Sequence, residues 1–289
     1  MQYFITQKAI SKSLKHCCTI DGDKKKFIIL SDFHMGIASH YDGFLNNSKL
    51  IAFALKEYIK NDYTIVINGD FLELWVNRNI ETIKYIHQDI FEILDEANQK
   101  GNLVYIAGNH DSTIFNHPEE LTTRFSLRTR KNIPCLKTPV YLSAKVVRTD
   151  KPDILIIHGH QASFYNFYTI PLLRWGIRYL FRPLEILGMK DTTRERLSSI
   201  EFGRVDAQLT HYAKQNNCIV VAGHTHSSVC EDTGHYYNDG TVIMPRCATL
   251  LELEENHFSL IRWDIHIKTS GTLHARRKVL VKRNADVRI

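Results

Sequence analysis

The sequence predicts an α/β fold in which short buried strands alternate with helices. Apolar runs of four to six residues, rich in β-branched side chains, recur along the chain and are typical of strands buried on both faces of a sheet. Helical patterns at about 46–60 and 80–100 separate the first three runs, and Gly101 is placed to end the second helix. This order favours parallel strands with right-handed crossovers. The expected strands are 27–30, 63–68, 103–107, 154–157 and 218–222.

A cluster of polar side chains follows each expected strand directly. Ligands bind at the carboxyl ends of strands in open α/β sheets, so the clusters are expected to lie together. Taken singly, each is weak evidence, since His158 could be a hydrogen-bonded histidine at a sheet end and Asn109 could be a turn residue. Five clusters that share carboxylates, an amide and imidazoles instead indicate one site. They are 31–34, 69–70, 108–111, 158–160 and 223–226.

Residues 162–215 interrupt this pattern, and we predict that they form a helical insert that caps the site. Pro171 suits a helix start, and Pro183 would end that helix. A second helix is expected to begin at Thr192, because Thr192 and Glu195 fit a capping box. After residue 235, the segments TVIMPRC and FSLIRWDI look like further strands of a second sheet.

The composition is that of an ordinary globular protein. Of the 289 residues, 44% are hydrophobic and 24% are charged, which allows a proper core. No apolar run approaches about eighteen residues, and the first residues lack the pattern of a secretory signal. We therefore expect one domain over 1–289 in a cytoplasmic protein whose six cysteines stay reduced.

The net charge of +6 is unevenly placed. From Arg276 to Arg288, six basic residues stand against one acidic residue, within an expected basic C-terminal tail at about 268–289. Such a tail would suit an anionic surface, either a membrane that the protein contacts peripherally or a nucleic acid. A solvated, mobile tail is the commoner explanation.

On its five clusters, the sequence resembles the calcineurin-like metallophosphoesterase superfamily over about residues 26–265. The resemblance implies a four-layer α-β-β-α sandwich of two mixed sheets flanked by helices, with the helical cap as an insert. It also implies two metal ions that share Asp70. The implied ligands of the first are Asp32, His34, Asp70 and His226, and those of the second are Asp70, Asn109, His158 and His224.

The resemblance makes His110 the histidine that meets the substrate and assists departure of the leaving group, with Asp111 orienting its imidazole. Glu73 stands where the superfamily commonly has an acidic residue, and it is expected to brace the site. His160 could brace the site or contact the substrate. Arg246, after an expected strand, could bind phosphate through its planar guanidinium or form a surface salt bridge.

The donor set suits two divalent transition metals. Two ions about 3.5–4 Å apart can hold the attacking and the leaving oxygen of an in-line displacement, and a carboxylate can bridge them. Imidazole ligands favour Mn, Fe, Zn or Co over Ca or Mg, and we expect Mn²⁺. A bridging hydroxide is the expected nucleophile, because a bound metal lowers the pKa of water, to about 7 at a zinc site. The predicted activity is metal-dependent phosphoester hydrolysis.

The insert carries the best clue to the substrate. Arg174, Arg178 and Arg182 share one helix face amid abundant apolar residues. We predict a cap whose Arg174 and Arg178 bind phosphates beside an apolar group; a helix that merely packs on its own domain is the alternative. The arrangement is similar to the UDP-2,3-diacylglucosamine hydrolases, although His110 stands where they typically have arginine. The chain looks closer still to a group of uncharacterised bacterial metallophosphoesterases.

Three classes of function remain open from the sequence. The favoured one is hydrolysis of a phosphoester or diphosphate in a small or lipid-linked molecule. The second is a phosphatase or nuclease that acts on a macromolecule, which the basic charge favours, although no nucleic-acid-binding module is recognisable. The third is a non-catalytic scaffold, which would be expected to have lost ligands, whereas all seven ligands and His110 are present.

Overall fold

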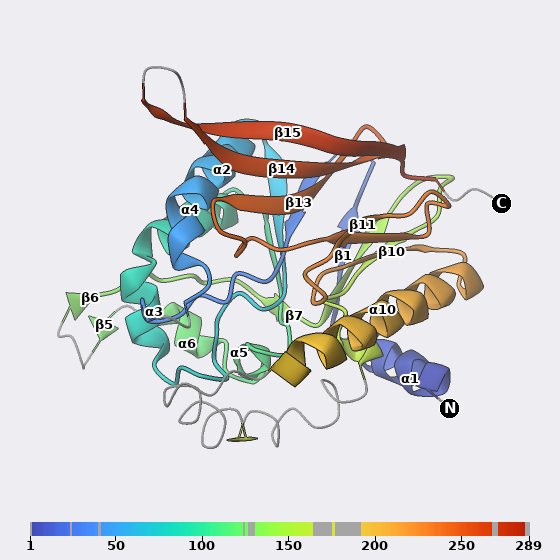
Figure 1. Cartoon of the computed structure of the whole chain (residues 1–289), viewed down its shortest axis with the longest axis horizontal. Coiled ribbons are helices and arrows are strands. Elements are labelled where there is room, and N and C mark those ends of the chain that lie inside the picture. The colour runs from blue at the N-terminus through green and yellow to red at the C-terminus, as the bar shows by residue number, and fades with distance from the viewer. Residues whose placement is uncertain are drawn as a thin grey trace.

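Two β-sheets lie face to face at the centre of the computed structural model, and helices cover the outer side of each (Figure 1). The structure describes residues 2–23, 25–39, 42–123, 125–126, 131–163, 175–176, 192–267 and 271–286. The predicted four-layer α-β-β-α sandwich of two mixed sheets is confirmed. The polar clusters of the two sheets lie together, because the strands that precede them end on the same side of the molecule.

The larger sheet contains the first three predicted strands. Its order is β15-β14-β13-β2-β3-β4-β7, in which β2, β3, β4 and β7 run parallel and the three C-terminal strands add antiparallel pairs. The strands are β2 (Lys26–Leu30), β3 (Tyr63–Asn68), β4 (Leu103–Ile106), β7 (Val140–Tyr141), β13 (Cys247–Glu254), β14 (His257–Ile267) and β15 (Leu273–Asn284).

The smaller sheet contains the other two predicted strands, β9 and β10, as parallel neighbours in the order β1-β8-β9-β10-β12-β11. Its strands are β1 (Cys17–Asp21), β8 (Ser143–Val147), β9 (Ile154–Ile156), β10 (Ile219–Ala222), β11 (Ser228–Cys230) and β12 (Tyr236–Asp239). A separate pair is formed by β5 (Phe125–Ser126) and β6 (Lys131–Asn132).

Helices cover both sheets, and three apolar cores hold the four layers together. The larger sheet is covered by α2 (Ser48–Lys60), α3 (Ile80–Ile86) and α4 (Gln88–Gln99), and the smaller one by α1 (Gln2–Leu14) and α10 (Thr192–Gln215). Alternate residues of β3 face different cores, since Ile65 and Ile67 pack toward the helices and Val66 packs between the sheets. Short helical turns are η1 (Leu45–Asn47), α5 (Ser112–Asn116), α6 (Glu119–Thr122) and η2 (His160–Ala162).

The C-terminal third differs from the sequence-based expectation. Residues 258–265 lie in β14, but β14 joins the sheet of β2 through β13, and TVIMPRC is a loop up to Cys247. The expected tail was also wrong, because residues 273–284 form the edge strand β15. Arg276 pairs with Asp264 at 2.9 Å and Arg277 with Glu252 at 2.5 Å, so two of the basic residues bind acidic partners within the sheet.

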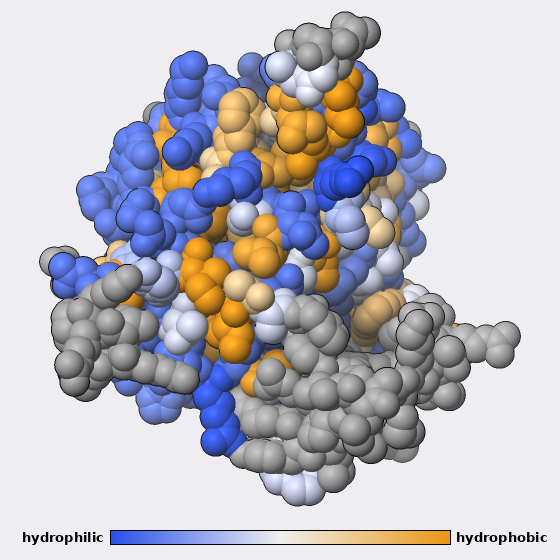
Figure 2. All heavy atoms as spheres, turned by 60° about the vertical axis from the view of Figure 1, so that its left-hand side comes forward, coloured by the Kyte–Doolittle hydropathy of each residue, from blue (hydrophilic) through white to orange (hydrophobic). Residues whose placement is uncertain are grey.

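The outer end of the β14–β15 hairpin is apolar. Ile267 is 61% exposed and Leu273 is 70% exposed, and Figure 2 shows apolar side chains gathered beside hydrophilic ones at the top of the molecule, where these strands lie. The two side chains are neighbours because Ile267 pairs with Leu273 across the strands. The basic strand β15 thus carries an exposed apolar end.

The insert is described in part. Its second helix, α10, begins at Thr192 as predicted and lies in the connection between the neighbouring strands β9 and β10. Val205, Leu209 and Ala213 of α10 pack in the core under the smaller sheet. The first predicted helix, with its row Arg174, Arg178 and Arg182, falls outside the described residues.

A buried asparagine holds the loop that leads into β13. The Asn47 amide nitrogen lies 2.6 Å from the carbonyl oxygens of Val242 and Met244 and 3.0 Å from that of Cys247. Its Oδ1 accepts the backbone N–H of Arg246 at 3.0 Å. One side chain therefore satisfies the backbone of a loop that has no strand partner of its own.

We expect Asn47→Ala to lower the free energy of unfolding by about 2–3 kcal/mol, because buried carbonyl groups lose their donor and an N–H loses its acceptor. Urea denaturation measures this. Asn61→Ala is the matched control, since the exposed Asn61 amide donates to Glu57 O at 2.7 Å and should cost less than about 1 kcal/mol. Equal losses in the two variants would show that Asn47 does not stabilise the loop.

Candidate metal centre

The predicted ligands come from both sheets and meet where the strands end. Asp32, Asp70 and Asn109 follow β2, β3 and β4 of the larger sheet, whereas His158 and the 224–226 segment follow β9 and β10 of the smaller one. Three groups of side chains offer donor atoms that lie within 4.8 Å of one another. They are Asp32 with His34 and His226, His34 with Asp70 and His110, and Asp70 with His158 and His224.

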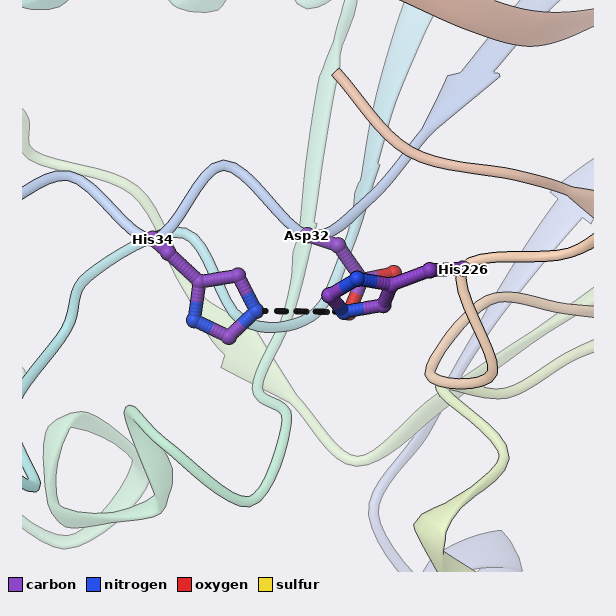
Figure 3. Close-up of side chains that lie close together, drawn as sticks. All are labelled: Asp32, His34 and His226. Carbon is purple, nitrogen blue, oxygen red and sulfur yellow. Dashed lines mark hydrogen bonds and ion pairs between the residues drawn. The ribbon is translucent and has the colours of Figure 1, made fainter. Parts of the chain in front are cut away.

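In the first group, two imidazoles point toward one another beside a carboxylate (Figure 3). His34 Nε2 and His226 Nε2 are 3.4 Å apart, and they lie 3.6 Å and 3.1 Å from Asp32 Oδ1. The other oxygen, Oδ2, accepts the His224 N–H at 2.9 Å and the Ser31 hydroxyl. Asp32 is thus held through one oxygen while it presents the second to two histidines.

Asp70 is held in the same way and faces both of the other groups. Its Oδ1 accepts the backbone N–H of His110 at 2.8 Å. Its Oδ2 lies 3.1 Å from His158 Nε2 and 3.9 Å from His34 Nε2. His158 Nδ1 lies 2.7 Å from Asn68 O, which places the proton on Nδ1 and leaves Nε2 as the donor atom. Asp70 is therefore placed to bridge two cations.

Three buried atoms of predicted ligands make no hydrogen bond among the described residues, namely Asp32 Oδ1, Asn109 Oδ1 and His158 Nε2. Two of them, Asp32 Oδ1 and His158 Nε2, each lie 3.1 Å from an atom of another predicted ligand. Buried polar atoms are normally satisfied, because leaving one unsatisfied costs free energy. A carboxylate oxygen, an amide oxygen and an imidazole nitrogen are all ligands of divalent transition metals. The residues present therefore fit the metal ions that the sequence implies.

The backbone around the ligands is strained. Five predicted ligands have a positive φ, between 46° and 66°: Asp32, His34, Asp70, His224 and His226. Non-glycine residues adopt this region rarely, and such strain concentrates at functional sites. Gly108 and Gly223 allow close approach, because a Cβ there would collide with Asp70 Oδ1 and with Ser31 Oγ respectively. The chain thus accepts a local energetic cost to bring these side chains together.

Electrostatics favour a cation at the same place. Burial alone would raise the pKa of Asp32 and Asp70, but neighbouring imidazoles, His226 and His158 above all, hold both pKa values well below the usual range. Burial would lower the pKa of His158, yet the charge of Asp70 raises it to about 9. Burial and the charge of His158 lower the pKa of His224 to about 3. The carboxylates are therefore ionised and His224 is neutral, which are the forms that bind metal, whereas His158 would have to give up its Nε2 proton to a bound ion.

Glu73, not Asp111, holds the His110 imidazole. Glu73 Oε2 lies 2.7 Å from His110 Nδ1 and 3.1 Å from His34 Nδ1, and Oε1 accepts the Trp75 N–H at 3.1 Å. One carboxylate thus orients a predicted metal ligand and the predicted catalytic histidine together. Burial alone would raise the pKa of Glu73, but the charges and hydrogen bonds of His110 and His34 together hold it far below its usual value.

The prediction that Asp111 orients His110 was wrong for a geometric reason. The buried Asp111 carboxylate accepts the backbone N–H groups of Gly108 at 2.7 Å and Phe71 at 2.9 Å and the Tyr105 hydroxyl at 2.7 Å. These bonds join the loop after β3 to the loop after β4. Asp111 therefore fixes the backbone that carries Asp70 and Asn109.

The sequence also predicts site residues outside the ligand set, namely His160, Arg246, Arg174 and Arg178. His160 is buried, and its ring centroid is 5.5 Å from that of His158, so it lies beside a predicted ligand. Arg246 is exposed and precedes β13; it does not follow a strand, because the segment before it is a loop. Arg174 and Arg178 are outside the described residues.

Sequence reasoning missed two residues beside the site. Asp239, at the end of β12, lies 2.6 Å from the Ser31 hydroxyl oxygen and accepts the Asn68 amide at 3.3 Å, and burial raises its pKa to about 8. Trp75 stacks on His110 with ring centroids 4.1 Å apart. Neither stands in a cluster after a predicted strand, so the sequence pattern carried no signal for them.

The family model described as calcineurin-like phosphoesterase matches residues 25–240. Vps29 of Chaetomium thermophilum is a similar solved structure, with 8% identity and a TM-score of 0.41 over 90% of this chain and 97% of that one. A Staphylococcus aureus protein provisionally named a 5′-nucleotidase has 13% identity and a TM-score of 0.34, over 89% of this chain and 54% of that one. No curated protein matches the chain. Among the described residues, no helix has the length and apolarity to cross a membrane.

Proposed function

This chain belongs to the calcineurin-like phosphoesterase family, and we propose that it is a hydrolase that uses two divalent metal ions to cleave a phosphoester. The observation that carries the proposal is the position of Asp70. Its Oδ2 faces His158 at 3.1 Å and His34 at 3.9 Å, and each histidine belongs to a different group of candidate ligands. One shared carboxylate between two groups is the arrangement that a dinuclear centre requires.

Asp32, His34, Asp70 and His226 would hold one ion, and Asp70, Asn109, His158 and His224 would hold the second. Divalent cations bound there would supply Lewis-acid charge and acidified water for attack on phosphorus. The mixed oxygen and imidazole donors favour Mn²⁺, with Fe, Zn or Co as alternatives.

The residues beyond the ligands would handle the leaving group. His110 is 21% exposed at its side chain, and its Nδ1 faces Glu73, so Nε2 is the nitrogen left for the substrate. A proton donated from Nε2 would neutralise the departing oxygen, and the Glu73 carboxylate would balance the charge of the doubly protonated ring. General acid catalysis of this kind contributes about 10²–10⁴-fold to a rate.

We propose a small or lipid-linked phosphoester or diphosphate as the substrate. The support is the sequence of the segment between β9 and β10, where arginines among apolar residues suit charged phosphates next to an apolar group. A hydrolysis panel with Mn²⁺ tests this, with monoesters, diesters, nucleotide-diphosphate lipids, an oligonucleotide and a phosphopeptide as separate arms. Cleavage of only the last two would favour a macromolecular substrate. No cleavage by protein that holds two Mn²⁺ ions would favour a binding scaffold.

A further inference from the structure

Trp75 contacts the His110 ring and the residue before it. The indole and the imidazole are stacked, with centroids 4.1 Å apart and ring planes 9° apart. The indole N–H donates to the carbonyl oxygen of Asn109 at 2.8 Å. Trp75 is only 4% exposed, and its own backbone N–H donates to Glu73 Oε1. Burial and these hydrogen bonds therefore hold the indole ring in one orientation against His110.

Three contacts together fix the His110 ring. Glu73 accepts from Nδ1 at 2.7 Å, His34 meets the ring edge-on with centroids 4.6 Å apart, and Trp75 covers one face. The hydrogen bond to Glu73 alone allows the imidazole to swing about the Nδ1–oxygen direction, because the second torsion of a histidine side chain is broad. A stacked indole removes that freedom, since a swing would drive the imidazole edge into the indole face.

We propose that the indole face of Trp75 is a positioning element that aims His110 Nε2 at the departing oxygen of the substrate. This inference rests on the proposed function, in which His110 donates the proton. Trp75 acts through His110 and makes no contact with the substrate in this proposal.

The test compares the rates at which the Mn²⁺-loaded protein hydrolyses a phenyl and a p-nitrophenyl phosphate ester. Both are monoesters or both are diesters, according to the type that the protein hydrolyses. Phenolate is the poorer leaving group and needs protonation more. Trp75→Met fills much of the space without a flat face, and it should lower kcat for the phenyl ester by about 10- to 100-fold, part of the 10²–10⁴-fold that a general acid supplies. For the nitrophenyl ester, kcat should change less than about threefold, and KM and the number of bound Mn²⁺ ions should stay the same. Trp75→Phe keeps an aromatic face and should keep most of the phenyl-ester rate.

Trp263→Met is the matched control, because Trp263 is equally buried at 5% exposure and its indole N–H donates to Tyr58 OH at 3.1 Å on the helix side of the larger sheet. It should leave the ratio of the two rates unchanged. The inference is overturned if Trp75→Met slows both esters equally, or if Trp75→Phe is as impaired as Trp75→Met. If Trp75→Met fails to fold, the test depends on Trp75→Phe alone. This variant should keep the wild-type ratio of kcat for the phenyl ester to kcat for the nitrophenyl ester, and a much lower ratio would contradict the role of the aromatic face. A wild-type protein that cleaves neither ester would instead overturn the proposed function.

Discussion

Asp70→Asn should hold fewer than two Mn²⁺ ions per chain and should hydrolyse its best substrate at least about 10³-fold more slowly. The substitution removes a negative charge that faces ligands of both ions, through Oδ2 at 3.1 Å from His158 Nε2 and 3.9 Å from His34 Nε2. Lewis-acid stabilisation by bound metal is worth several kcal/mol, and about 4 kcal/mol corresponds to 10³ in rate. Elemental analysis after Mn²⁺ saturation and gel filtration measures the occupancy.

Asparagine is the informative replacement because it keeps the rest of the site. Asp70 has a φ of 53°, which asparagine tolerates, and the amide oxygen can still accept the His110 N–H. Asp62→Asn is the matched control: Asp62 has a φ of 61° and bonds Asn102 at an exposed position away from the site. It should keep two ions and full activity. Retention of two ions by Asp70→Asn would contradict the bridging role.

The parts of the fold that the sequence predicted are those set by local pattern. Apolar runs such as 63–68 are buried along their whole length, and Gly101, with a φ of 71°, follows α4 as expected of a helix stop. What failed was strand pairing. Hydrophobic periodicity does not say which strand a run will join, so the sequence placed β14 in a second sheet, whereas it reaches β2 through β13.

In the candidate site, too, the sequence predicted what depends on local pattern and missed what depends on tertiary contacts. Strand-end position and residue type were sufficient to find ligands such as Asp32, Asp70 and His158, which the structure brings together from two different sheets. The direction of a side chain depends on its tertiary neighbours, and this is why the partner of His110 was misassigned. Asp111 follows His110 in the chain, but its carboxylate turns into the core, while Glu73 reaches His110 from the preceding loop.

His110→Ala should lower kcat by about 10²–10⁴-fold on an ester with a poor leaving group, because it removes the proposed general acid. Metal content should stay close to two ions, since His110 is not among the ligands assigned to either ion. This second readout matters, because the structure places His110 in a group with His34 and Asp70 that could itself hold a cation. The loss of one ion in His110→Ala would reassign this histidine as a ligand.

A nitrophenyl ester should reveal almost none of this loss, because its leaving group departs without protonation. Comparing the two esters in one variant therefore separates proton donation from a general disturbance of the site. His117→Ala is the matched control, because His117 also faces a carboxylate, Glu119, at 3.2 Å, but its side chain is 59% exposed on another segment. It should leave both rates unchanged. If His110→Ala slows both esters by the same factor while two ions stay bound, His110 acts by some means other than proton donation, such as holding the phosphoryl group.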